Sequence, residues 1–292
     1  MKKIKQALTL LSLRVYLNTL ALFHPEKAGA IAFQIFCTPR QGRLREKDHA
    51  FLNTADEHKD LYINDLNMRC YHWCGPGDTV LLVHGWESNA ARWQRVVRQL
   101  LAKGFDVVAV DGPGHGQSGS RQFNVPLYAR MLEAVVEQYQ PQSMVGHSIG
   151  GFASLFLLSE GHAPSVQQLA ILGTPAELTN IMAGYQRLLG LSRRVMRGFE
   201  QISRRRFGRA FIDFSGPAMV SRLAVEGLIV HDLNDATVPY ADAMAYADRW
   251  PQARLVTTRS QGHRLNGDGV PETIVGFLQS REVAYSSFGA TK

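Results

Sequence analysis

The sequence predicts an α/β fold, in which a mostly parallel sheet is flanked by helices on both faces. Short continuous apolar runs, rich in Val, Leu and Ile, alternate with helical segments along most of the chain. Such runs are typical of strands buried on both faces, and their alternation with helices indicates βαβ units joined by right-handed crossovers. A length of 292 residues, with 45% hydrophobic and 20% charged residues, excludes disordered, collagenous and coiled-coil proteins.

Each predicted element follows from a local pattern. The segment 60–73 alternates and breaks at Asn64-Asp65, which predicts a hairpin or two short strands. Apolar runs predict further strands, at 79–84, 106–111, 143–148, 167–174, 227–232 and 253–258. Helical spacing of apolar residues predicts the intervening helices, at 89–102, 126–139, 149–160, 239–249 and 271–280.

One stretch breaks the alternation of strands and helices. Residues 175–222 show no strand pattern, which predicts two or three short helices that form a cap over one edge of the sheet. The predicted organisation has three parts: an N-terminal helical extension at 1–50, an α/β core at 51–174 and 223–292, and a helical cap at 175–222. Because ligands of open parallel sheets bind at the carboxyl ends of the strands, reactive residues are expected there.

The net charge of +7 is concentrated in two segments. Residues 1–48 contain nine Lys or Arg and three acidic residues, and residues 175–213 contain eight Arg and three acidic residues. A basic protein often binds nucleic acid, but no nucleic-acid-binding motif accompanies these arginines, so no nucleic-acid partner is predicted. We expect the cap arginines to be solvated on helices whose apolar side covers the pocket. The alternative is that they bind an anionic substrate or an anionic membrane surface.

The N-terminal segment 1–23 combines a lysine-rich start with an apolar stretch that Arg14 and Asn18 interrupt. Its leucines recur at helical spacing, which predicts an amphipathic helix packed on the domain. The lysines also favour a helix that lies on a membrane surface, and a signal peptide or anchor is a third interpretation. No uninterrupted apolar run approaches the roughly 20 residues needed to cross a bilayer.

Three cysteines are too few for a disulfide scaffold, and no Cys/His cluster has zinc-like spacing. These features indicate a reducing compartment and a cytoplasmic location, with membrane association through the N-terminal helix as the alternative.

The most specific motif is Gly146-His147-Ser148-Ile149-Gly150-Gly151. It fits G-x-S-x-G and lies between a predicted strand and a predicted helix, which is the context of a nucleophile elbow. The sharp reversal from strand to helix demands residues without a Cβ on both sides of the serine. We therefore expect Ser148 to be a nucleophile above the sheet, with the Ile149 N–H pointing into the same space.

A serine nucleophile needs a histidine base that is held by a carboxylate. His263 follows the last predicted strand and is the expected base. Asp232 and Asp235 follow the strand before it, and both are candidate acids. Other histidines have structural interpretations: His84 and His147 flank strand ends and would orient loops, His115 lies in a glycine-rich loop, and His231 lies within a strand.

With these segments in order, the sequence resembles the α/β-hydrolase superfamily over about residues 60–281. The resemblance rests on four segments in the family order, which are His84-Gly85-Trp86, Asp111-Gly112-Pro113-Gly114-His115-Gly116-Gln117-Ser118, the elbow, and Asp235 with His263. It implies that Asp235 is the acid, because His231–Pro239 is similar to the family pattern H-G-x-x-D-x-x-V-P with Asp232 in place of the glycine. It also implies that the backbone N–H of Trp86 is the second oxyanion donor, beside that of Ile149.

The resemblance is to capped HGx-type serine hydrolases of the esterase and lysophospholipase kind, since no HGGG motif is present. We expect a hydrolase that cleaves a carboxylic ester or thioester through an acyl-enzyme on Ser148, with His84, Gly85, Gly146, His147 and Gly150 in supporting positions. An acyltransferase or perhydrolase with the same triad, or a non-catalytic binding protein on the same fold, are the alternatives. No metal or cofactor is expected, the partner is a small acyl ester, and the sequence does not reveal the oligomeric state.

Overall fold

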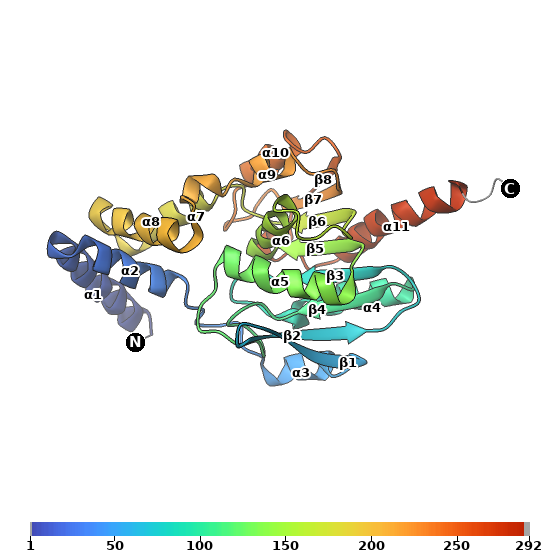
Figure 1. The fold of residues 1–292 in the computed structure, drawn as a ribbon, viewed down its shortest axis with the longest axis horizontal. Coiled ribbons are helices and arrows are strands. Elements are labelled where there is room, and N and C mark those ends of the chain that lie inside the picture. Colours follow the sequence, from blue (N-terminus) through green and yellow to red (C-terminus); the bar gives the residue numbers. More distant parts are fainter. Residues whose placement is uncertain (1, 289–292) are drawn as a thin grey trace. The chain divides into compact units, whose positions relative to one another are not determined.

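The computed structural model describes the backbone of residues 2–288 and the side chains of residues 7–280. The chain divides into two compact units (Figure 1). The helical unit comprises Met1–Thr38 and Glu177–Ser215, and the sheet unit comprises Pro39–Ala176 and Gly216–Lys292. The division differs from the predicted one: the N-terminal helices and the inserted helices belong to one unit, and residues 39–50 belong with the sheet.

The sheet unit contains one eight-stranded sheet in the order β1-β2-β4-β3-β5-β6-β7-β8. Strands β3 to β8 pair in parallel, whereas β1 and β2 are antiparallel. The mostly parallel sheet predicted from the apolar runs is therefore confirmed. The strands are β1 (Glu57–Ile63), β2 (Leu66–Trp73), β3 (Thr79–Val83), β4 (Asp106–Val110), β5 (Ser143–His147), β6 (Gln168–Leu172), β7 (Glu226–Asp232) and β8 (Ala253–Thr258).

Asn64 and Asp65 form the two-residue turn of the β1–β2 hairpin, and both have positive φ values of 46° and 63°. Asn and Asp tolerate this left-handed conformation better than other residues with a side chain, and a turn of this kind matches the twist of the flanking strands. The hairpin predicted at this dipeptide is confirmed.

Helices cover both faces of the sheet. α4 (Gln94–Ala102) packs against α11 (Val270–Phe288), while α5 (Val125–Tyr139) packs against α6 (Ile149–Ser159). Val80 and Leu82 of β3 share a core with α4 and α11, whereas Leu81 between them faces away from that core, as expected for alternating side chains. The remaining helices of this unit are α3 (Glu46–Leu52), α9 (Gly216–Val220) and α10 (Tyr240–Ala247), with short 3₁₀ turns at Ala90–Trp93 and Gly262–Arg264.

The helical unit consists of α1 (Lys2–Phe23), α2 (Pro25–Phe36), α7 (Leu178–Leu189), α8 (Arg193–Phe207) and a 3₁₀ turn at Phe211–Asp213. It has its own apolar core, in which Phe33 of α2 contacts Phe199 of α8. α2 and α8 cross closely because Gly29 and Gly198 lie at the contact: a Cβ on Gly29 would lie 2.2 Å from the Gly198 carbonyl carbon.

The pattern at residues 1–23 predicts α1, and α2 lies in the rest of the predicted N-terminal helical extension. Pro25 occupies the first turn of α2, where a missing N–H costs nothing and the fixed φ favours the helix. Among the described residues, no helix combines the length and the apolarity that crossing a membrane requires. The side chains of Lys2, Lys3 and Lys5, which favoured a membrane-surface helix, lie outside the described residues.

Candidate active site

Ser148 stands at the sharp turn between β5 and α6. Its backbone has φ 53° and ψ −127°, a conformation that is costly for a residue with a side chain and that is found mainly at functional sites. The Ser148 N–H donates to the Leu172 carbonyl of β6 at 2.8 Å, which ties the strained residue to the neighbouring strand. The predicted reversal from strand to helix is therefore present at this serine.

The glycines beside Ser148 are needed because backbone passes against them. A Cβ on Gly146 would lie 2.4 Å from the Gly151 Cα, and a Cβ on Gly150 would lie 2.2 Å from the His84 carbonyl oxygen. Both distances are far below van der Waals contact. The strand-to-helix turn at Ser148 can form only when these positions lack a side chain.

Two hydrogen bonds join Ser148, His263 and Asp235. His263 Nε2 lies 3.0 Å from Ser148 Oγ, and His263 Nδ1 lies 2.7 Å from Asp235 Oδ2. The three residues lie in the turn or loops that follow β5, β7 and β8, which are far apart in the sequence and meet at the carboxyl edge of the sheet. With Nδ1–H donated to the carboxylate, Nε2 is left as the acceptor that can take the hydroxyl proton.

The side chain of Asp235 is fully buried, and its carboxyl group is ionised. Burial raises the pKa of its carboxyl group, but hydrogen bonds from His263 and from the N–H groups of Val238 and Thr237 outweigh that effect and hold the pKa below its usual range. The two backbone bonds, 2.9 and 2.7 Å long, both end on Oδ1. Oδ2 is left for the imidazole, so the carboxylate is held in the orientation that the His263 ring requires.

Asp232, the other candidate acid, does not contact His263. Its Oδ2 accepts from the Thr258 hydroxyl at 2.6 Å and from the Gln261 N–H at 2.8 Å. Burial raises its pKa, but these bonds, with backbone N–H donors, outweigh the effect and lower it. Asp232 thus binds the start of the loop that contains His263, and the structure pairs Asp235 with the histidine.

His147 connects the elbow to the same loop. Its Nε2–H donates to the carbonyl oxygen of His263 at 2.7 Å, and burial lowers the pKa of His147 well below the ordinary value, so the ring is neutral. The residue immediately before the serine therefore holds the backbone of the histidine. The sequence predicted that His147 orients a loop, and this contact identifies the loop.

The His84-Gly85-Trp86 segment lies against the serine. A Cβ on Gly85 would lie 2.9 Å from the Ser148 Cβ, so only glycine fits here. His84 is fully buried, its Nε2 accepts from the Gly112 N–H at 2.8 Å, and its Nδ1 therefore donates to the Gly85 carbonyl at 2.7 Å. Burial lowers the pKa of His84 to about 4, which keeps the ring neutral.

The bond from His84 also orients the Trp86 N–H. In a trans peptide the carbonyl oxygen and the following N–H point in opposite directions. Because the Gly85 oxygen is turned toward the His84 ring, the Trp86 N–H is turned away from it. The Ile149 N–H is the first of α6, where an amide has no carbonyl partner within its own helix.

The glycine-rich loop 111–120 forms hydrogen bonds with the residues that follow the His84-Gly85-Trp86 segment. His115 Nε2 accepts from the Glu87 N–H at 2.9 Å, and burial lowers the pKa of His115 to about 3. The buried Asp111 accepts from the Ala90 N–H and from the Tyr71 hydroxyl, at 2.8 and 2.9 Å. The loop therefore anchors the backbone that follows Trp86.

Sequence reasoning missed Gly173 and Arg92. Gly173 follows β6 with φ 54°, and a Cβ there would lie 3.4 Å from His263 Nδ1 and 3.5 Å from Asp235 Oδ2. Arg92 Nη2 donates to the Arg264 carbonyl at 2.7 Å, directly beside His263. In the sequence, Gly173 is only a glycine that follows a predicted strand. Arg92 stands next to a tryptophan, and no motif there indicates that it contacts the active site.

Among the described residues, one group of side chains could hold a metal ion: Glu57, His72 and Cys74, whose donor atoms all lie within 4.8 Å of one another. His72 Nε2 is already bound to Asp106 at 2.8 Å. Asp106 is the first residue of β4, so this group lies at the amino edge of the parallel strands. It is at the opposite end of the strands from Ser148.

Comparison with known proteins shows what this chain is similar to. Residues 78–208 match the family model described as the alpha/beta hydrolase fold. The match to the α/β-hydrolase family thus covers just under half of the chain, and the mostly parallel eight-stranded sheet has that fold. The solved structure of alpha/beta hydrolase domain-containing protein 10 from mouse superposes with a TM-score of 0.61 at 17% identity, over 78% of this chain and 99% of that one, which shows a shared fold.

Two curated relatives match parts of the chain. A serine hydrolase-like protein of Danio rerio is 33% identical over 122 residues, which is 38% of this chain and 36% of that protein. A pimeloyl-[acyl-carrier protein] methyl ester esterase of Vibrio vulnificus is 32% identical over 140 residues, which is 45% of this chain and 50% of that protein. The matches thus span half or less of the relatives' length.

Proposed function

We propose that this α/β hydrolase is a serine hydrolase that cleaves a carboxylic ester or thioester through an acyl-enzyme on Ser148. The observation that carries the proposal is the continuous chain of hydrogen bonds from Ser148 Oγ through His263 to the buried Asp235 carboxylate. The left-handed backbone of Ser148 supports the same conclusion, because the strain serves to present the hydroxyl.

In this mechanism Ser148 Oγ attacks the acyl carbon while its proton passes to His263 Nε2. The carbonyl oxygen becomes an oxyanion, and the Asp235 carboxylate stabilises the imidazolium. Collapse of the tetrahedral intermediate breaks the bond to the alcohol or thiol, which leaves with the proton from His263. Water then attacks the acyl-enzyme with His263 as base, and the acid is released with Ser148 regenerated.

In the proposed mechanism, the N–H groups of Trp86 and Ile149 bind the oxyanion. The orientation of the Gly85–Trp86 peptide by His84 and the position of Ile149 at the start of α6 support this assignment. Loss of one such donor typically costs about 10²- to 10³-fold in rate. Since both donors belong to the backbone, the Trp86 side chain is free to shape the substrate site.

The comparisons support ester chemistry, because one relative is named as a methyl ester esterase. The type of nucleophile also supports ester chemistry, because a serine at the elbow forms an acyl-enzyme ester that water can hydrolyse. The proposed substrate class is therefore an acyl ester or thioester, and the proposed acyl acceptor is water.

Replacing Ser148 by Ala tests the proposal. The S148A protein is expected to lose hydrolysis of short p-nitrophenyl esters by at least about 10³-fold, and to lose labelling by a fluorophosphonate. S159A, at the far end of the helix that follows Ser148, serves as the matched control and should keep both. Adding methanol, a thiol or hydrogen peroxide should leave the free acid as the main product.

Three results would contradict the proposal. Full activity or labelling of the S148A protein would remove Ser148 as the nucleophile. A native protein that neither labels nor hydrolyses any of a panel of acyl chain lengths and head groups would indicate a binding protein on the same fold. Transfer of the acyl group mainly to an added acceptor would instead identify an acyltransferase.

A further inference from the structure

The net positive charge of the molecule belongs to the helical unit. Its two segments hold thirteen Lys or Arg and four Asp or Glu, whereas the whole chain has a net charge of +7. The sheet unit is therefore slightly negative. A charge of one sign gathered on one unit produces a field that attracts an oppositely charged surface and repels a second copy of the same unit.

α1 is apolar on two opposite faces. Leu17 and Ala21 are buried in the core of the helical unit, with Leu10 and Leu20 packed beside them. On the other side, Leu8, Leu11, Val15 and Leu22 are 58%, 55%, 58% and 58% exposed. Their spacing of three, four and seven residues places them in one stripe along the helix.

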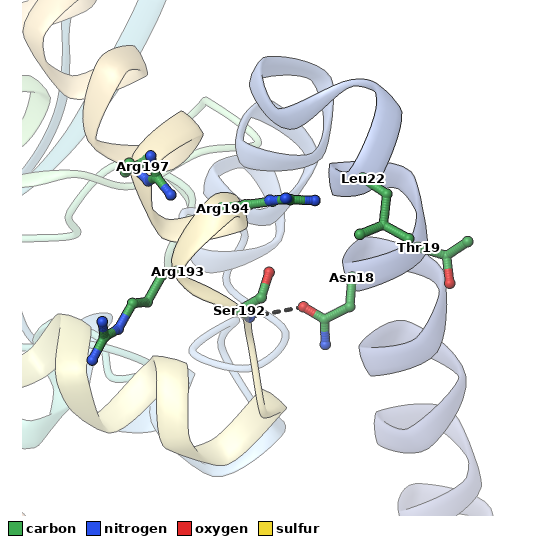
Figure 2. Close-up of a pocket in the computed structure, with 7 residues that line it drawn as sticks. All are labelled: Asn18, Thr19, Leu22, Ser192, Arg193, Arg194 and Arg197. Atoms are coloured by element: carbon green, nitrogen blue, oxygen red, sulfur yellow. Dashed lines mark hydrogen bonds between the residues drawn. The ribbon is translucent and has the colours of Figure 1, made fainter.

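This exposed stripe is a stable surface, because polar contacts hold α1 in place. The Asn18 side chain donates to the Gly190 carbonyl at 2.9 Å. It also accepts from the Ser192 N–H at 2.7 Å, and this second bond is drawn in Figure 2. These bonds attach α1 to the turn between α7 and α8. Rotation of the helix to bury the stripe would break them and expose Leu17. A large exposed apolar stripe of this kind marks an interaction site.

A groove with three arginines lies beside the stripe. It has a volume of about 500 Å³ and is lined by Leu22, Asn18 and Thr19 of α1 and by Ser192, Arg193, Arg194 and Arg197 of α8. Figure 2 shows the Arg194 side chain extending from α8 toward Leu22. The apolar stripe and the cationic groove are thus continuous at Leu22.

The arginines of the groove differ from those at the other end of α8. Arg204 pairs with Glu200 and Arg205 pairs with Glu26, at 3.4 and 2.9 Å. Arg193, Arg194 and Arg197 make no ion pair with any residue whose side chain is described, and all three are exposed. Guanidinium groups suit phosphate because their N–H donors match its oxygens.

We propose that the helical unit binds the surface of an anionic phospholipid bilayer. The stripe of α1 would enter the acyl boundary, and Arg193, Arg194 and Arg197 would bind lipid phosphates at the depth of the head groups. The combination of an apolar face with flanking basic residues is that of an interfacial helix, which lies in the plane of the membrane. A second copy of the chain fits less well, because its helical unit has the same strong positive charge.

Flotation of the full-length protein with lipid vesicles tests this proposal. The protein should float with vesicles of phosphatidylcholine and phosphatidylglycerol, bind much more weakly to phosphatidylcholine alone, and lose most of its binding at about 1 M salt, where screening is nearly complete. Each basic residue contributes roughly fivefold to binding at an anionic surface, so R193Q/R194Q/R197Q should weaken binding by roughly 100-fold.

Matched variants separate the specific surface from net charge and fold. R98Q/R121Q/R249Q removes the same charge from the sheet unit and should leave binding within a few-fold of the native protein. L8S/L11S/L22S should abolish binding even at low salt, while L188S, at an exposed leucine of α7, should not. Circular dichroism checks that each variant is folded. Because flotation needs no turnover, the S148A protein should bind as the native protein does, whatever its hydrolytic activity.

Three results would overturn the proposal. The first is no flotation with anionic vesicles. The second is a dimer in sedimentation that L8S/L11S/L22S dissociates, which would show that a second copy covers the stripe. The third is complete displacement from vesicles by millimolar glycerol phosphate, which would identify a soluble phosphate ester as the ligand of the arginines.

Discussion

Single residues around Ser148 act mainly by orienting other groups. The Asp235 carboxylate is held by backbone N–H groups, His147 holds the His263 carbonyl, and His84 holds the Gly85 carbonyl. Neither of the two histidine contacts needs a charged imidazole, and burial keeps both His84 and His147 neutral by lowering their pKa. The histidines therefore serve different purposes, and only His263 lies within hydrogen-bond distance of the serine hydroxyl.

The hydrogen bond from His84 to the Gly85 carbonyl can be tested by substituting His84. H84A should lower kcat by roughly 100-fold with little change in KM, because the Trp86 N–H would lose its orientation toward the oxyanion of the transition state. H84N should restore part of kcat, since its amide N–H can donate near the position of Nδ1. Steady-state kinetics with a p-nitrophenyl ester measure both values. Equal losses in both variants, with a raised KM, would indicate a structural role only.

At the scale of elements, close contact between α2 and α8 joins the two chain segments of the helical unit. Gly29 and Gly198 allow the approach, and Phe33, Phe36 and Phe199 pack around it. The pairing involves segments separated by more than a hundred residues, so each helix has its partner on the other segment. The predicted N-terminal extension and predicted cap are consequently one structure.

G29A should destabilise the protein by roughly 1–3 kcal/mol, because the added methyl group meets the Gly198 backbone and the helices must separate. G184A is a matched control on α7, where a Cβ would meet nothing within 4 Å. It should stabilise the helix by about 0.5–1 kcal/mol through its better helix propensity. Urea unfolding followed by circular dichroism measures both changes. A neutral G29A would show that α2 and α8 are not closely packed in solution.

At the scale of the whole molecule, burial divides the three cysteines. Cys37 and Cys70 are buried in the helical unit and the sheet unit respectively, and burial raises the pKa of each thiol to about 12. Cys74, at the end of β2, is exposed. Each unit thus contains one buried thiol that reports on its integrity.

Alkylation at pH 8 should therefore modify Cys74 alone in the folded protein and all three cysteines in denaturant. The thiolate is the reactive form, and the raised pKa of the buried thiols leaves almost none of it at this pH. Mass spectrometry of iodoacetamide-treated protein counts the modified residues. Rapid modification of Cys37 in the native protein, with Cys70 protected, would show that the helical unit opens independently of the sheet.

Local patterns were enough for the strands, the hairpin at Asn64-Asp65 and the turn at Ser148. Each depends on neighbours in the sequence: alternation or continuity of apolar residues, two residues that tolerate positive φ, and glycines where a Cβ would clash. The chain order of serine, acid and histidine also followed from the sequence. The structure then brought Ser148, Asp235 and His263 within hydrogen-bond distance of one another.

The residues by themselves left both Asp232 and Asp235 as candidates, the family resemblance implied Asp235, and the structure pairs Asp235 with the histidine. Only the tertiary structure revealed Gly173 and Arg92 beside the histidine and joined the first two helices to the inserted ones. These outcomes depend on contacts between residues far apart in the chain. The path of a loop and the direction of a side chain decide which of two similar groups, such as Asp232 and Asp235, comes within hydrogen-bond distance of the histidine. A residue's type and its neighbours determine its local conformation, but they do not specify which distant group it will meet.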